Sequence, residues 1–110
     1  MEIYDQIREV LKSDFKLNDI ITLQEIKSIL MDRYGMNPGR IILTDYCYNR
    51  FNDGIPFTKH LFEYIGKATF KYLGENYPYT GKIYHKPKQH NTEIIVGEWI
   101  NGGKTMSKQQ

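Results

Sequence analysis

The sequence predicts an α+β fold of the winged helix-turn-helix type, with three N-terminal helices followed by a β-hairpin and a C-terminal strand. Apolar residues repeat at helical spacing through the first half, and the period changes to two from His60 onward. Two apolar-rich runs in the second half are then separated by a short turn containing glycine. We expect residues 1–100 to form one domain and residues 101–110 a flexible tail without an apolar pattern.

Two helices are indicated together with their ends. Residues 2–13 place Ile3, Ile7 and Val10 on one face with charged residues opposite, which is typical of an amphipathic helix. A second helix is expected over residues 23–34. Thr22 is its predicted N-cap, in a capping box with Glu25, and Gly35 is the predicted stop.

A third helix is expected after Asn37, because Pro38 suits the first helical position. Its buried face is ambiguous, since apolar side chains fall all round the helical wheel between Ile41 and Phe51. A break near Leu43, with Thr44 capping a fresh helix, is an open alternative.

The second half predicts strands. Residues 61–65 and 69–73 form a predicted hairpin whose turn is residues 66–68. Residues 82–90 alternate basic and apolar side chains and contain Pro87, as expected of an edge strand or an arm. Residues 93–100 are the last predicted strand, and we expect it to pair with the hairpin.

Composition excludes several classes of protein. The 110 residues include nine Tyr, five Phe and one Trp, more rings than a small core needs, so some should be exposed. The single cysteine, Cys47, excludes an intramolecular disulfide and thiolate-rich zinc sites, and the three histidines show no metal-binding spacing. The N-terminus is not a signal peptide, and no apolar run approaches the roughly 20 residues of a membrane span. We therefore expect a cytoplasmic protein without metal, cofactor or membrane contact.

Charge is divided unevenly along the chain. Residues 1–54 carry 7 Lys and Arg against 9 Asp and Glu, whereas residues 55–110 carry 8 Lys against 4 Glu. The basic half interleaves lysines with tyrosines, and this combination suits phosphate contacts and base stacking. The phosphate-contacting residues predicted there are Lys67, Lys71, Lys82, Lys86 and Lys88. The alternative is that the interleaved rings belong to the core.

The third helix supplies the remaining candidates for nucleic-acid binding. If it enters a DNA groove, the side chains able to reach phosphates or base edges are Arg40, Thr44, Tyr48, Asn49 and Arg50. Against this, the same helix carries Asp45, which phosphate would repel, so these residues could equally be a solvated face.

The sequence indicates a binding protein and not an enzyme. It contains no Ser-His-Asp arrangement, phosphate-binding loop or His-Glu-x-x-His helix. The first hypothesis is a nucleic-acid-binding protein with duplex DNA as its partner. The alternative is a protein-interaction or inhibitor module that uses an exposed Tyr-rich surface, because Tyr and Arg also dominate protein interfaces. The base sequence, the choice of DNA or RNA and the oligomeric state stay open.

A longer string carries a family resemblance. Thr44-Asp45-Tyr46-Cys47-Tyr48-Asn49-Arg50, followed by Leu61-Phe62-Glu63-Tyr64 and Tyr77-Pro78-Tyr79-Thr80-Gly81, resembles a poorly characterised bacterial and phage domain family. The resemblance covers about residues 37–99. It implies a winged-helix-like DNA-recognition domain that occurs alone or beside HNH-type endonuclease domains, in phage or bacterial defence or regulation. No active site is carried over, because the HNH metal ligands are absent from the sequence.

Overall fold

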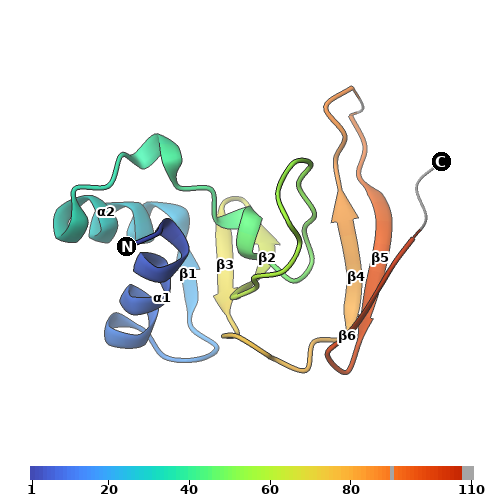
Figure 1. The fold of residues 1–110 in the computed structure, drawn as a ribbon, viewed down its shortest axis with the longest axis horizontal. Helices are drawn as coiled ribbons and strands as arrows, with labels where there is room; N and C mark the ends of the chain where they lie inside the picture. Colours follow the sequence, from blue (N-terminus) through green and yellow to red (C-terminus); the bar gives the residue numbers. More distant parts are fainter. Residues whose placement is uncertain (90, 108–110) are drawn as a thin grey trace.

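The computed structural model describes residues 1–89 and 91–107. Two α-helices and a three-stranded antiparallel sheet form one end of the molecule, and a second three-stranded antiparallel sheet forms the other (Figure 1). The molecule measures 43 × 31 × 25 Å. The predicted winged helix with three N-terminal helices is therefore wrong, although the α+β class holds.

The two predicted helices are confirmed. Helix α1 spans Ile3–Asp14 and buries Ile7, Val10 and Leu11. Helix α2 spans Leu23–Tyr34, and both hydrogen bonds of its capping box form between Thr22 and Glu25. Gly35 ends α2 in the left-handed conformation at φ 65°, as the glycine signal predicted.

The first sheet contains the predicted hairpin. Strand β2 (Phe62–Gly66) pairs with β3 (Thr69–Tyr72), and β3 pairs on its other side with a short strand β1 (Ile20–Thr22), so the order is β1-β3-β2. The sheet and the two helices enclose the first core, which is mainly aliphatic and includes Ile7, Leu11, Ile26, Leu30, Phe62 and Phe70.

The predicted third helix does not form. Two short 3₁₀ segments, η1 (Pro38–Arg40) and η2 (Leu43–Tyr46), replace it, and the backbone is extended between and after them. The all-round apolar pattern explains this, because a helix on one face cannot bury Ile41, Leu43 and Cys47 together. The extended chain buries all three and pairs Cys47 with Phe62 of β2.

The second sheet contains β4 (Gly81–His85), β5 (Ile94–Ile100) and β6 (Gly103–Met106), in the order β4-β5-β6. We expected β5 to pair with the hairpin and residues 101–110 to be a flexible tail, of which residues 108–110 lie outside the described part of the chain. Instead, a turn with left-handed Asn101 and Gly102 returns the chain along β5 as β6. The exposed, polar character of β6 hid it, because an edge strand needs backbone partners and not apolar side chains.

A second core, rich in rings, lies against this sheet. It contains Tyr48, Leu73, Tyr79, Ile83, Val96 and Trp99. Residues 47–51 join the two halves of the molecule, since the Tyr48 amide donates to the Phe62 carbonyl of β2 at 2.8 Å. Two residues further along the chain, Arg50 bridges to Tyr84 of β4. The two cores therefore meet at Tyr48.

Candidate functional site

The residues predicted for a recognition helix are not on one surface. Tyr48 is only 2% exposed and belongs to the second core. The Asn49 amide bonds both the backbone N–H and the carbonyl of Tyr64, and Arg50 is paired with the Glu93 carboxylate. Thr44 accepts a hydrogen bond from Asn52, and Arg40 is exposed at the end of η1. Of these five residues, only Arg40 projects a charge that is free of such internal bonds.

The predicted lysines are dispersed over both sheets. Lys67 lies in the β2–β3 turn and Lys71 on the central strand β3, whereas Lys82, Lys86 and Lys88 lie on β4 and the loop after it. Lys82 is paired with Glu98 at 3.2 Å. Two of the four tyrosines between these lysines are unavailable for stacking, because Tyr72 and Tyr79 are 7% and 6% exposed, whereas Tyr77 is 39% exposed.

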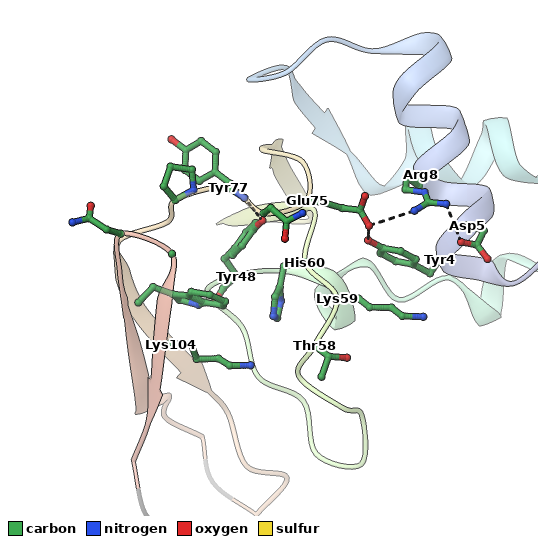
Figure 2. Close-up of a pocket in the computed structure, with 15 residues that line it drawn as sticks. Tyr4, Asp5, Arg8, Tyr48, Thr58, Lys59, His60, Glu75, Tyr77 and Lys104 are labelled. Carbon is green, nitrogen blue, oxygen red and sulfur yellow. Dashed lines mark hydrogen bonds and ion pairs between the residues drawn. The ribbon is translucent and has the colours of Figure 1, made fainter.

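A cavity of about 670 Å³ lies where the two halves of the molecule meet. We call it the larger cavity. It is bounded by α1, residues 58–60, residues 75–78 and the β5–β6 hairpin (Figure 2). Its volume falls within the roughly 300–1,000 Å³ typical of ligand sites. The cavity is formed by segments that are distant in sequence, which no local pattern could reveal.

His60 forms the inner wall of the larger cavity. It is 8% exposed, and its ring lies 4.4 Å from Phe57 and 5.1 Å from both Tyr48 and Trp99, measured between ring centroids. Nδ1 lies 3.1 Å from the Cys47 carbonyl, while buried Nε2 has no hydrogen-bond partner among the described residues. Burial lowers the pKa of His60 to about 4. The ring is therefore neutral at pH 7, and if Nδ1–H donates to Cys47, Nε2 is an unused acceptor.

Tyr48, His60 and Trp99 line one side of the larger cavity, which we call the aromatic wall, and hydrogen bonds hold Tyr48 and Trp99 in place. The Tyr48 hydroxyl donates to the Gly74 carbonyl at 2.6 Å and accepts from the Tyr77 amide at 3.0 Å. The indole N–H of Trp99 donates to the Tyr48 carbonyl at 2.7 Å. Because every polar atom of these two rings is satisfied, the wall is fixed before any ligand arrives.

Two lysines stand over the rings of the larger cavity. The Lys104 ammonium lies 4.8 Å from the Phe57 ring centre and 5.6 Å from that of Trp99, and it donates to the Phe57 carbonyl at 2.5 Å. Lys59 lies 5.0 Å from the centre of the Tyr4 ring. Neither lysine forms an ion pair within residues 1–89 and 91–107. Partial burial lowers the pKa of Lys104, so its charge is incompletely solvated.

At the rim of the larger cavity formed by α1 and Glu75, the charged side chains are paired with one another. Glu75 accepts hydrogen bonds from the Tyr4 hydroxyl and from Arg8, and Arg8 also pairs with Asp5 at 3.3 Å. The Tyr4 hydroxyl and Arg8 lower the pKa of Glu75, so it stays ionised and neutralises Arg8 (Figure 2). Lys59 and Lys104 are therefore the cations available to an incoming anion.

Sequence reasoning did not identify three residues that line the larger cavity, namely Lys59, His60 and Lys104. His60 and Lys59 precede the hairpin in a connection without a motif, and Lys104 lies in the segment expected to be a tail. The only local signal was the surplus of rings, which does not say which rings line a cavity. Within the part of the chain that is described, no three His, Cys, Asp or Glu side chains are grouped to hold a metal, and no helix is long and apolar enough to cross a membrane.

The fold and cavity define an α+β protein in which two helices and two antiparallel sheets enclose a ring-lined, cationic cavity. The chain belongs to the family described as Domain of unknown function (DUF7225), whose model matches residues 2–106. It is also similar to "Uncharacterized protein YnaC" of Bacillus subtilis (strain 168), with 54% identity over 106 residues, or 96% of this chain. The match spans 40% of that relative's length. No solved structure matches the chain.

Proposed function

We propose that this protein binds unpaired nucleic acid in the larger cavity. The observation that supports this most is the position of Lys59 and Lys104, which have no carboxylate partners among the described residues, beside a fixed wall of aromatic rings. Lysines bind phosphate by releasing condensed counterions, and an exposed ring can stack on a base. Tyr48 and Trp99 are only 2% and 7% exposed, so they shape the cavity, whereas Tyr77 at 39% is the ring available for stacking. This proposal keeps nucleic acid as the ligand class of the first sequence hypothesis, but it replaces duplex DNA with an unpaired strand and moves the site to different residues.

The surrounding groups suit a nucleotide. Tyr77 is 39% exposed at the cavity rim, where its ring can stack on a base. The side-chain amides of Asn76 and Asn101 also line the cavity and offer both donors and acceptors to a base edge. The ligand fits as an anion attached to a flat, hydrogen-bonding ring.

The concave shape favours a single strand over a duplex. The helix that would have entered a major groove is replaced by η1, η2 and extended chain. In a duplex the bases are stacked inside, so only an unpaired or extruded base can enter a cavity of this kind. Duplex DNA binding through Lys67, Lys71, Lys86 and Lys88 would have to rely on dispersed phosphate contacts.

Fluorescence anisotropy with a labelled short single strand, and with the corresponding duplex, tests this proposal. We expect the single strand to bind more tightly. Lys59→Gln with Lys104→Gln should weaken binding and reduce the salt slope by about 1.4, at about 0.7 per lost phosphate contact. The matched control is Lys86→Gln with Lys88→Gln, which removes two exposed lysines outside the cavity.

Three outcomes would reject the proposal. The first is that the cavity double variant, shown to be folded by circular dichroism, binds with unchanged affinity and salt slope. The second is that only the control variant loses affinity, which would restore the basic β4–β5 region as the site. The third is that no nucleic acid binds, which would favour the alternative of a protein-binding module.

A further inference from the structure

A second cavity adjoins the proposed site, and we infer that the two are consecutive subsites for neighbouring nucleotides of one strand. This inference rests on the proposed function and specifies its ligand as a polymer. The second cavity has a volume of about 450 Å³, and we call it the smaller cavity. It shares three lining residues with the larger cavity: Tyr4, Thr58 and Lys59. The shared residues make the two cavities neighbours, with Tyr4, Thr58 and Lys59 between them, and we call the route along both cavities the path.

Lys59 stands at the junction of this path. Its ammonium lies over the Tyr4 ring at 5.0 Å and has no carboxylate partner in residues 1–89 and 91–107. A cation that lines both cavities can contact the phosphate that joins two nucleotides. In that position, one nucleoside would lie in each cavity and the linking phosphate at Lys59.

The lining of the smaller cavity suits a flat, partly apolar group such as a base. Ile3, Met36 and Tyr46 line it and are only partly buried against the first core, so part of each side chain faces the cavity. Pro56 and Ile55, the latter 40% exposed, form its outer edge. A base placed here would cover apolar surface that is now in contact with water.

Arg40 provides a cation that lines the smaller cavity and not the larger one. It is exposed, and it forms no ion pair with the residues that the structure describes. Glu2 and Asp45 also line the smaller cavity and oppose an anion, and the hydrogen bond that Asp45 accepts from the neutral Asn52 amide at 2.8 Å leaves its charge in place. Arg40 and Lys59 must therefore outweigh these two carboxylates. A guanidinium can bind one phosphate through two hydrogen bonds, so Arg40 is the residue expected to hold the next phosphate.

A length series tests the inference by calorimetric titration with thymidine monophosphate, the dinucleotide and the tetranucleotide. We expect affinity to rise by about tenfold or more from the monophosphate to the tetranucleotide, the effect of one additional charged contact. Arg40→Gln should remove about tenfold of affinity for the tetranucleotide and leave the monophosphate unchanged. Arg40→Lys should restore part of the loss, and Arg33→Gln, a change at an arginine outside both cavities, should have no effect.

The outcomes separate this inference from the proposed function. If the monophosphate and the tetranucleotide bind equally, the second subsite is wrong while the larger cavity stands. An Arg40→Gln protein that loses affinity for both ligands equally would also overturn it, because Arg40 would then act on the first subsite or on the fold. Absence of binding by every ligand would reject the proposed function itself, and the inference with it.

Discussion

The two halves of the molecule differ in the side chains that form their cores. The first core, between the helices and the β1-β3-β2 sheet, is mainly aliphatic, and its members Ile7, Ile26 and Leu30 are fully buried. The second core, against the β4-β5-β6 sheet, is built on rings that carry polar atoms, chiefly Tyr48, Tyr79 and Trp99. Aliphatic side chains need only be packed, whereas these rings also need hydrogen-bond partners.

This difference explains where the cavity lies. The rings of the second core point their polar atoms toward backbone and carboxylate partners at the boundary between the halves, as in the bond from the Tyr79 hydroxyl to Glu63 at 2.7 Å. Rings whose polar atoms are already hydrogen-bonded keep their positions when one side of them lines a cavity. The first core thus serves as the scaffold and the second as the wall of the site.

The largest expected effect concerns the scaffold. Phe62→Ala removes a fully buried ring that contacts Phe70 in the first core, and it should lower the free energy of unfolding by about 3–5 kcal/mol. Chemical denaturation measures the change. If the variant does not fold, Ile7→Val provides the milder test, with an expected loss of about 1 kcal/mol. Losses well below these values would mean that the first core is not the main source of stability.

The next effect is a pH dependence that belongs to the second core. His60 has a pKa of about 4 in the folded protein against 6.5 when unperturbed, because burial disfavours its charged form. The unfolded state therefore binds the proton first, and stability should be full above pH 6.5 and fall as the pH drops toward 4, by about 3 kcal/mol in all.

The control for this pH dependence is His60→Gln, whose amide can still donate to the Cys47 carbonyl. In this variant the loss of stability between pH 6.5 and 4 should shrink to the part contributed by carboxylates such as Glu75. Urea denaturation across this pH range measures both proteins. Identical pH profiles would show that His60 is not held neutral by its aromatic surroundings.

A smaller loss is expected at the residue that joins the halves. Tyr48→Phe keeps the ring but leaves the Gly74 carbonyl and the Tyr77 amide without their partner, which should cost about 1–3 kcal/mol. Thermal unfolding measures this, with Tyr34→Phe on the exposed end of α2 as the control. An unchanged melting temperature would contradict the view that hydrogen bonds fix the wall of the larger cavity.

The smallest effect is expected from the capping box, far from the cavity. Thr22→Ala removes the hydroxyl that accepts from the Glu25 amide and should cost about 1 kcal/mol, while Thr22→Ser should cost little. Binding of nucleic acid should be the same in both variants, since Thr22 lines neither the larger nor the smaller cavity. A change in affinity would mean that the scaffold and the site are coupled more closely than the two-core comparison implies.

Local signals predicted two of the three expected helices and the hairpin. The capping box at Thr22 and Glu25 and the stop at Gly35 depend on residues within one turn of each other, and both form. The hairpin was visible because its two strands adjoin in sequence. In contrast, β6 pairs through its backbone with β5, and its exposed side chains carry no pattern that announces a strand.

Long-range packing explains why the third helix and the site could not be predicted. Residues 41–48 follow helical signals locally, but they must bury Leu43 in the first core and Tyr48 in the second, which only an extended path achieves. Likewise, Lys59 and Lys104 are 45 positions apart and meet at one cavity only because β6 folds back along β5. The surplus of rings was visible, but their burial was not.

The most direct test of the site is a titration of the labelled protein with a short single-stranded oligonucleotide, followed by two-dimensional NMR. Trp99 is the single tryptophan, so its indole N–H, buried behind the wall of the larger cavity and bonded to the Tyr48 carbonyl, gives one resonance. We expect that resonance and the amides of residues 58–60, 75–77 and 101–104 to shift together, while those of α2 stay in place. Shifts confined to the loop after β4, with the Trp99 indole unmoved, would contradict the account and place the binding surface elsewhere.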